Sequence, residues 1–210
     1  MGDFKRIHAI GDSHSGTLHD SCHANNCGPK TIYAITQPKD DLLATLEVMI
    51  ARDQLTRDAM WIFCFGEIDI RCHVHNQIHL KKRLEEDIIV ALVDTYLTKI
   101  KTLHPDIGVM SVVPPLIFNG REAEVLSDPA FEIYKIVGSD ADRSRYTAFM
   151  NKYLRHRCEE ESLLSVDVYS IYKDENGMLP IECSDGNVHI SNRSKIPPLL
   201  ASMGLIPQPK

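Results

Sequence analysis

Two stretches at opposite ends of the chain carry side chains that could together transfer an acyl group. Residues 5–16 read KRIHAIGDSHSG, a short apolar run that ends in a glycine and leads into Ser13. Residues 183–191 read CSDGNVHIS, in which Asp185 lies four positions before His189. A serine nucleophile needs a base that takes its proton, and the base needs a carboxylate that orients it. The two stretches supply all three groups.

The first stretch has a catalytic and a structural interpretation. If its apolar part is a buried strand, Ser13 follows the C-terminal end of that strand, where open α/β sheets bind ligands. Backbone N–H groups at the start of a following helix could then stabilise an oxyanion. An Asp-Ser pair also caps helices without any chemistry. The catalytic interpretation is favoured by Asp185 and His189, because parallel strands bring distant loops to one sheet edge.

The elements that must position these residues alternate between two kinds. Short segments rich in β-branched or aromatic residues are typical of buried strands, and they are RIHAI (6–10), TIYAI (31–35), WIFCF (61–65), IGVMSVV (107–113) and LLSVDVY (163–169). Helical periodicity marks residues 40–52, 80–103 and 142–160. This alternation predicts a parallel sheet covered by helices on both faces. The connection over residues 114–140 is expected to be a surface excursion near the strand ends.

The composition limits the class of protein. A chain of 210 residues, 43% hydrophobic and 25% charged, is long enough for one globular domain. Its net charge of −6, with no basic stripe, argues against nucleic acid as a partner. No segment approaches about 18 uninterrupted apolar residues, and the N-terminal apolar run is short for a signal peptide. We therefore expect a cytoplasmic protein that does not enter a membrane, with its six scattered cysteines reduced.

The order of three blocks resembles the SGNH, or GDSL-type, hydrolase superfamily of esterases and lipases. These blocks are the Gly-Asp-Ser motif ending at Ser13, a block that begins at Gly66 after the third segment, and Asp185 with His189. The resemblance implies one domain over residues 1–210, with a flavodoxin-like three-layer α/β/α fold and a five-stranded parallel sheet. It also implies a Ser-His-Asp triad that hydrolyses or transfers acyl groups, with no cofactor and no metal.

The resemblance assigns a role to each matching residue. Ser13 corresponds to the nucleophile and supplies one N–H group to the oxyanion, His189 to the base, and Asp185 to the acid that orients it. Gly28 is the best match for the glycine of the second block, whose N–H also faces the oxyanion. The family usually has its aspartate three residues before the histidine, so the spacing of four here requires a bulged loop. A backbone carbonyl is the alternative partner for His189.

The third block departs from the family pattern. The family has an asparagine, which donates to the oxyanion, where this chain has Ile68. Losing one such donor typically costs about 3 to 4 kcal/mol of transition-state stabilisation. Arg71 or Asn76 could replace it, although Arg71 could equally pair with Glu67 or Asp69. Together with these residues, Asp12 and Gly66 complete the set that we expect near the oxyanion or the substrate.

The sequence favours a serine esterase or acyltransferase that acts on an O-acyl ester, such as an acetyl ester, of a small molecule or carbohydrate. One alternative is a catalytically silent binding protein that keeps the fold. Another is a metal site, because thiolates and imidazoles are the usual ligands of zinc and two segments are rich in them: His19, Cys22, His23 and Cys27, and Cys72, His73, His75 and His79. Glu67 and Asp69 also suggest a glycosidase pair, but the serine-first order of the blocks fits an esterase better.

Overall fold

The computed structural model describes residues 6–37, 39–52, 59–103, 107–120 and 134–208. Within them, one sheet has the strand order β2-β1-β3-β4-β5, and every neighbouring pair is parallel. The strands are β1 (Arg6–Gly11), β2 (His23–Asn26), β3 (Ala59–Cys64), β4 (Ile107–Met110) and β5 (Leu164–Val166). The predicted five-stranded parallel sheet is therefore confirmed.

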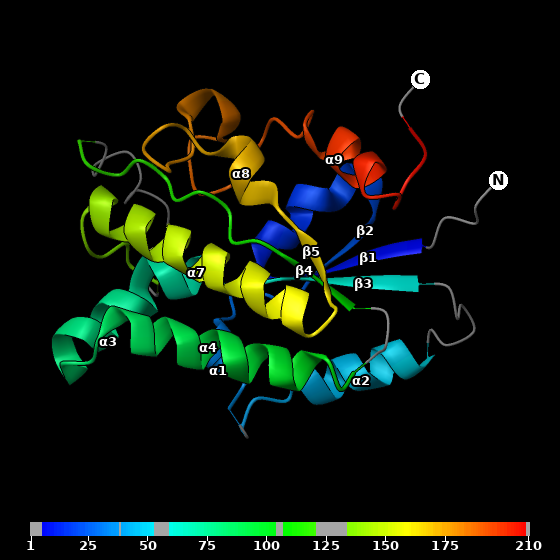
Figure 1. The fold of residues 1–210 in the computed structure, drawn as a ribbon, viewed down its shortest axis with the longest axis horizontal. Coiled ribbons are helices and arrows are strands. Elements are labelled where there is room, and N and C mark those ends of the chain that lie inside the picture. Colours follow the sequence, from blue (N-terminus) through cyan, green and yellow to red (C-terminus); the bar gives the residue numbers. More distant parts are fainter. Residues whose placement is uncertain (1–5, 38, 53–58, 104–106, 121–133, 209–210) are drawn as a thin grey trace.

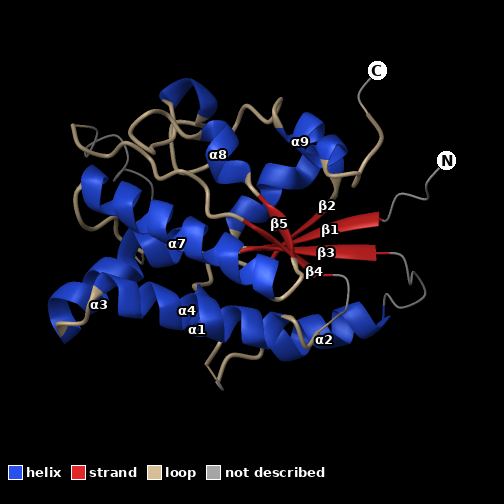
Figure 2. Cartoon of the chain, viewed as in Figure 1, coloured by secondary structure: helices blue, strands red, loops and turns tan. Residues whose placement is uncertain are grey.

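Helices cover both faces of this sheet (Figures 1 and 2). One face packs against α1 (Ile32–Ile35), α2 (Leu42–Arg52), α4 (Glu85–Ile100) and α7 (Asp140–Glu160). The other packs against the 3₁₀ helix η1 (Ser13–Ser21), α8 (Val168–Tyr172) and α9 (Ile196–Ser202). The remaining helices are the π-helical turn η3 (Asp69–His73), α3 (Val74–Lys81) and η4 (Ile181–Cys183). The three-layer α/β/α architecture is as predicted. In the described ranges, no helix has both the length and the apolar character needed to span a bilayer.

The strand predicted for TIYAI at residues 31–35 is wrong, because this segment forms α1. Thr31 caps the helix by accepting a hydrogen bond from the N–H group of Ala34 at 2.9 Å. The buried carboxylate of Asp69 accepts two more, from the N–H groups of Ile32 (2.6 Å) and Tyr33 (3.2 Å). The side chains of Thr31 and Asp69 therefore accept the N–H groups that have no partner within the helix. The helix is too short to show a helical periodicity in the sequence.

The missing strand is the polar segment HANN, which forms β2 at the edge of the sheet. It pairs only with β1, and its side chains are half-buried or exposed, so it lacks the apolar pattern of a central strand. The apolar segments at 107–113 and 163–169 are strands only at β4 and β5. After β5, Asp167 accepts a hydrogen bond from Ser170 N–H and α8 begins at once.

The helix boundaries differ from prediction where a cap or a left-handed residue intervenes. The helix predicted over residues 80–103 is divided between two helices, because α3 ends at Lys81, just before Lys82 with its φ of +54°, and α4 begins only at Glu85. Helix α7 starts two residues earlier than predicted, since Ser139 and Asp142 form a reciprocal capping box. Of the surface excursion predicted over 114–140, residues 121–133 lie outside the described part.

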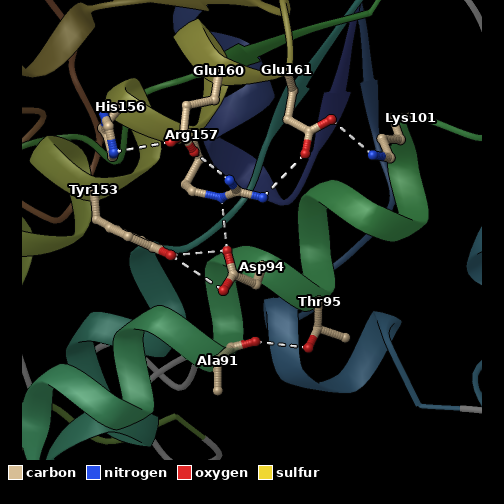
Figure 3. A network of polar contacts seen from close by, with 9 residues as sticks. All are labelled: Ala91, Asp94, Thr95, Lys101, Tyr153, His156, Arg157, Glu160 and Glu161. Atoms are coloured by element: carbon tan, nitrogen blue, oxygen red, sulfur yellow. Dashed lines mark hydrogen bonds and ion pairs between the residues drawn. The ribbon is translucent and has the colours of Figure 1, made fainter.

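Helices α4 and α7 lie side by side and are joined by a polar network (Figure 3). Arg157 donates to Asp94 at 2.9 Å and to Glu161 at 3.1 Å, and Lys101 donates to Glu161 at 2.8 Å. The Tyr153 hydroxyl also donates to Asp94, at 3.0 Å. Partly exposed ion pairs of this kind contribute little individually. The network fixes the register of the two helices, while the apolar cluster beneath them supplies most of the stability.

A close approach between β1 and β3 places the start of η1. Gly11 pairs with Cys64 across the two strands, and a Cβ atom on Gly11 would lie 2.0 Å from the Cys64 carbonyl oxygen. That neighbour is backbone in the middle of the sheet and cannot move aside cheaply. Only glycine therefore lets β1 end here and turn into the residues that follow.

We predict that Gly11→Ala destabilises the protein by at least about 2 kcal/mol, because the added methyl group overpacks the centre of the sheet. Gly16→Ala is the matched control, since its Cβ would meet its nearest neighbour, the Arg193 guanidinium, only at 4.0 Å. Urea unfolding followed by circular dichroism measures both. Equal midpoints for the two variants would contradict the steric role of Gly11.

Candidate active site

Ser13, His189 and Asp185 meet at the C-terminal edge of the sheet. The Nε2 atom of His189 lies 2.8 Å from the Ser13 hydroxyl oxygen, and its Nδ1 atom lies 2.9 Å from Asp185 Oδ2. Ser13 is the first residue of η1, two positions after β1 ends, whereas the other two lie in the loop between η4 and α9. Ser13 is exposed although its neighbours Asp12 and His14 are buried. The sheet edge thus presents one hydroxyl group to solvent with an imidazole beside it.

The loop from Asp185 to His189 bulges as the longer spacing requires. The Asp185 N–H group donates to the His189 carbonyl at 3.1 Å, which closes the loop. Asp185 Oδ1 accepts from the N–H groups of Asn187 (2.8 Å) and His189 (3.3 Å), so Oδ2 faces the imidazole. Gly186 takes a left-handed conformation with φ +91°, which a residue with a side chain would rarely adopt. The extra residue is absorbed without separating the carboxylate from the imidazole.

The surroundings of His189 favour its neutral form. Burial and the positive charge of His14 lower its pKa, and the carboxylate of Asp185 opposes them. Burial tends to raise the pKa of Asp185, but hydrogen bonds from the N–H group of Asn187 and from His189 lower it overall. A neutral imidazole with Nδ1–H directed at a carboxylate leaves Nε2 able to accept a proton. His189 can therefore act as a base toward Ser13 near neutral pH.

A cluster of buried charges lies beside Ser13. The Asp12 carboxylate accepts the N–H group of His14 at 2.8 Å, and His14 Nε2 lies 3.5 Å from Glu67 Oε2. Arg71 approaches the same oxygen of Glu67 at 3.4 Å. Burial raises the pKa of Asp12 to about 6, whereas for Glu67 the charges of Arg71 and His14 overcome burial and lower the pKa to about 2. Arg71 thus pairs with Glu67, the alternative role considered for it.

The glycines expected near the oxyanion lie at two strand ends. Gly66 follows β3 with φ +120°, and a Cβ there would lie 2.7 Å from Val112 Cγ2. This conformation directs the chain into Glu67 and the π-helical turn. Gly28 follows β2, and its N–H group donates to the Asn26 side chain at 2.9 Å. For this N–H group to donate to an oxyanion, its hydrogen bond to the Asn26 side chain would have to break.

The third block contains no side-chain donor at its expected place. Ile68 is buried, 3% exposed, yet it belongs to none of the three apolar clusters of the described core. Asn76, the other proposed replacement, is exposed on α3, and no contact joins it to Ser13 or His189 in the described part of the chain. Of the two replacements, only Arg71 belongs to the buried charge cluster that adjoins Ser13.

Two hollows adjoin the Ser13–His189 pair. An open groove of about 440 Å³ contains this pair and is otherwise lined largely by polar residues, namely Gly16, Thr17, Asp185, Ile190, Ser191 and Arg193. The second is a smaller pocket whose wall includes Val188, the residue before His189. Its lining combines apolar side chains, such as Val112 and Leu116, with Glu67 and Arg71. The open groove is therefore the hollow from which a ligand would reach Ser13.

The histidines and cysteines considered as metal ligands are dispersed. Among the side chains that the structure describes, no three His, Cys, Asp or Glu residues gather as a metal site would require. His8 stacks between His23 and Trp61, and His73 stacks on Tyr33. The six cysteines all lie in described ranges and form no disulfide there. The Cys72 thiol donates to the Ile68 carbonyl, whereas the side chain of His19 lies outside the described part.

The pKa of His189 should respond to Asp185 in a defined direction. Because the carboxylate raises this pKa, Asp185→Asn should lower the titration midpoint of the imidazole by about half to one pH unit. Nuclear magnetic resonance of the ring protons measures the midpoint without any substrate. Asp87→Asn, which removes an exposed carboxylate from α4, should leave it unchanged. A midpoint that rises in Asp185→Asn would contradict the pairing.

Comparisons with known proteins agree on the fold. No family model matches the chain, and no curated protein sequence does. Among solved structures, it is similar to a candidate acylhydrolase of Bacteroides fragilis, with 16% identity, a TM-score of 0.57 and coverage of 96% of this chain and 86% of that one. It is likewise similar to a GDSL-like lipase of Bacteroides thetaiotaomicron, with 14% identity, a TM-score of 0.56 and coverage of 96% and 87%. The chain therefore has the fold of the SGNH, or GDSL-type, hydrolase superfamily, as its sequence blocks predict.

Proposed function

We propose that the protein is a serine esterase that hydrolyses or transfers an O-acyl group, through the triad of Ser13, His189 and Asp185. The observation that carries this proposal is the continuous hydrogen-bonded line from Ser13 Oγ through the two nitrogens of His189 to Asp185 Oδ2, at 2.8 and 2.9 Å. Nucleophile, base and orienting acid need this mutual geometry. Exposure of Ser13 gives a substrate access to it.

The reaction proceeds in two acyl transfers. Ser13 Oγ attacks the ester carbonyl carbon while His189 Nε2 takes the hydroxyl proton, and Asp185 stabilises the imidazolium. The N–H group of Ser13 at the start of η1 stabilises the oxyanion, and that of Gly28 joins it if its hydrogen bond to Asn26 opens. Collapse of the tetrahedral intermediate breaks the ester C–O bond, and the leaving alcohol takes the proton from His189. Water, or an acceptor hydroxyl, then loses its proton to His189 and attacks the acyl carbon. The bond from this carbon to Ser13 Oγ breaks, and His189 returns the proton to Oγ.

The two hollows favour a short acyl group on a hydroxyl-rich alcohol. The open groove offers Thr17, Ser191 and Arg193 as hydrogen-bonding groups, which suits a carbohydrate. The pocket that includes Val188 is small, and Glu67 and Arg71 lie beside Val112 and Leu116 in its lining, so a long apolar acyl chain would not fit it. An acetylated carbohydrate is thus the substrate class we propose.

The Ser13→Ala substitution should abolish hydrolysis of a short aryl acetate, because the acyl-enzyme cannot form without the hydroxyl group. Ser15→Ala should keep the activity, since the Ser15 side chain is fully buried in the same stretch. A fluorophosphonate probe with intact-mass detection adds a second readout: one adduct on wild type and on Ser15→Ala, and none on Ser13→Ala. Labelling of Ser13→Ala would refute Ser13 as the nucleophile.

The alternative is a binding protein that keeps the fold without catalysis, and Ile68 is the observation that favours it. A site that lacks a donor worth about 3 to 4 kcal/mol could have lost its reaction. Such a protein would take no fluorophosphonate adduct and would hydrolyse neither aryl acetates nor acetylated oligosaccharides. Adduct formation on Ser13 together with slow aryl acetate turnover would instead indicate a transferase that prefers its own acceptor.

A further inference from the structure

The strongest feature that the triad does not use is the buried imidazole of His14. It follows the nucleophile directly in sequence, yet its side chain is only 3% exposed. Its ring centroid lies 5.1 Å from that of His189, with the two planes at 39°. A buried ring so close to a catalytic base affects that base strongly if it carries charge, because little water lies between them.

Two nearby carboxylates favour a positive charge on this ring, and one of them, Glu67, contacts the ring itself. Asp12 lies at the end of β1 and accepts the backbone N–H group of His14, and Glu67 approaches Nε2 at 3.5 Å from the segment after β3. The other charged groups that face His14 are Arg71, behind Glu67, and His189 from the C-terminal loop. Burial opposes protonation of His14, but the two carboxylates outweigh it and raise its pKa.

The local backbone is built to place these groups. Gly66 has a positive φ of +120° directly before Glu67, and the π-helical turn η3 carries Arg71 to within 3.4 Å of the Glu67 oxygen that His14 also approaches. Burying four ionisable groups in one cluster costs free energy that an apolar cluster would not. Such an arrangement is expected where the charge itself is used.

We propose that His14 is a positioning residue, a buried cation held between Asp12 and Glu67 that acts on His189 and keeps the catalytic imidazole neutral. The proposal deepens the proposed function, since it concerns the base of the same triad. The positive charge makes it harder for His189 to bind a proton from solvent. The positive charge of His14 also attracts the negative charge that develops on the oxyanion beside Ser13. This attraction would partly replace the side-chain donor that is absent at Ile68.

The test compares His14→Gln with His14→Lys by titrating the His189 ring with nuclear magnetic resonance. Glutamine keeps a donor for Glu67 but removes the charge, so the midpoint of His189 should rise by roughly one to two pH units. Lysine restores the charge, so the midpoint should return toward that of wild type. His156→Gln, on the exposed surface of α7, should leave the midpoint unchanged. If His14 only fills space, glutamine and lysine give the same midpoint, which overturns the proposal.

A second measurement needs no variant. In wild type at pH 7, nitrogen chemical shifts should report protons on both ring nitrogens of His14 and on only one of His189; a neutral His14 would overturn the proposal. The acid limb of kcat/KM should shift with the His189 midpoint in His14→Gln. Failure of Ser13 to react with esters would remove this kinetic readout and the proposed function, but the two titrations would still decide the role of His14.

Discussion

The hydrogen bond between Ser13 and His189 joins residues 176 positions apart in the sequence, and the rest of the structure has to hold its two ends in place. A hydrogen bond weakens steeply when donor and acceptor are misaligned. One apolar cluster fixes both ends, because Leu18 of η1 packs in the same buried cluster as Cys183 and Ile190, which flank the loop that carries His189. The reactive geometry is therefore a consequence of burial on one face of the sheet.

Charge burial is the second constraint, and it works against stability. Asp12, His14, Glu67 and Arg71 lie at or below 8% exposure, directly beside an exposed serine. The positive and negative groups of the cluster alternate, and each positive group faces at least one carboxylate, which reduces the free-energy cost of burying them. A set of apolar residues of similar volume would often be as stable or more so. The cluster is best understood as an electrostatic environment for the reaction, maintained at a cost to folding.

The sequence predicted most of the fold because central strands and long helices follow hydrophobic periodicity. The prediction failed at TIYAI because a four-residue helix whose N–H groups are capped by Asp69, far away in sequence, leaves no local signal. It failed at HANN because an edge strand needs no apolar face. The three residues of the proposed triad could be named because the order of their sequence blocks resembles that of a known superfamily. The role of His14 could not, since Asp12 and Glu67 surround it only after β1 and β3 pair.

This site has Ile68 where a neutral hydrogen-bond donor is expected, and it has buried positive groups nearby. The second feature can compensate for the first. An amide donor stabilises an oxyanion only along its N–H bond, so it must be placed accurately. A charge acts through space over several ångströms in a medium that screens poorly, so His14 need not touch the oxyanion. Salt screens buried charges far less than exposed ones. The proposed charge on His14 would therefore make this site more sensitive to pH than to ionic strength.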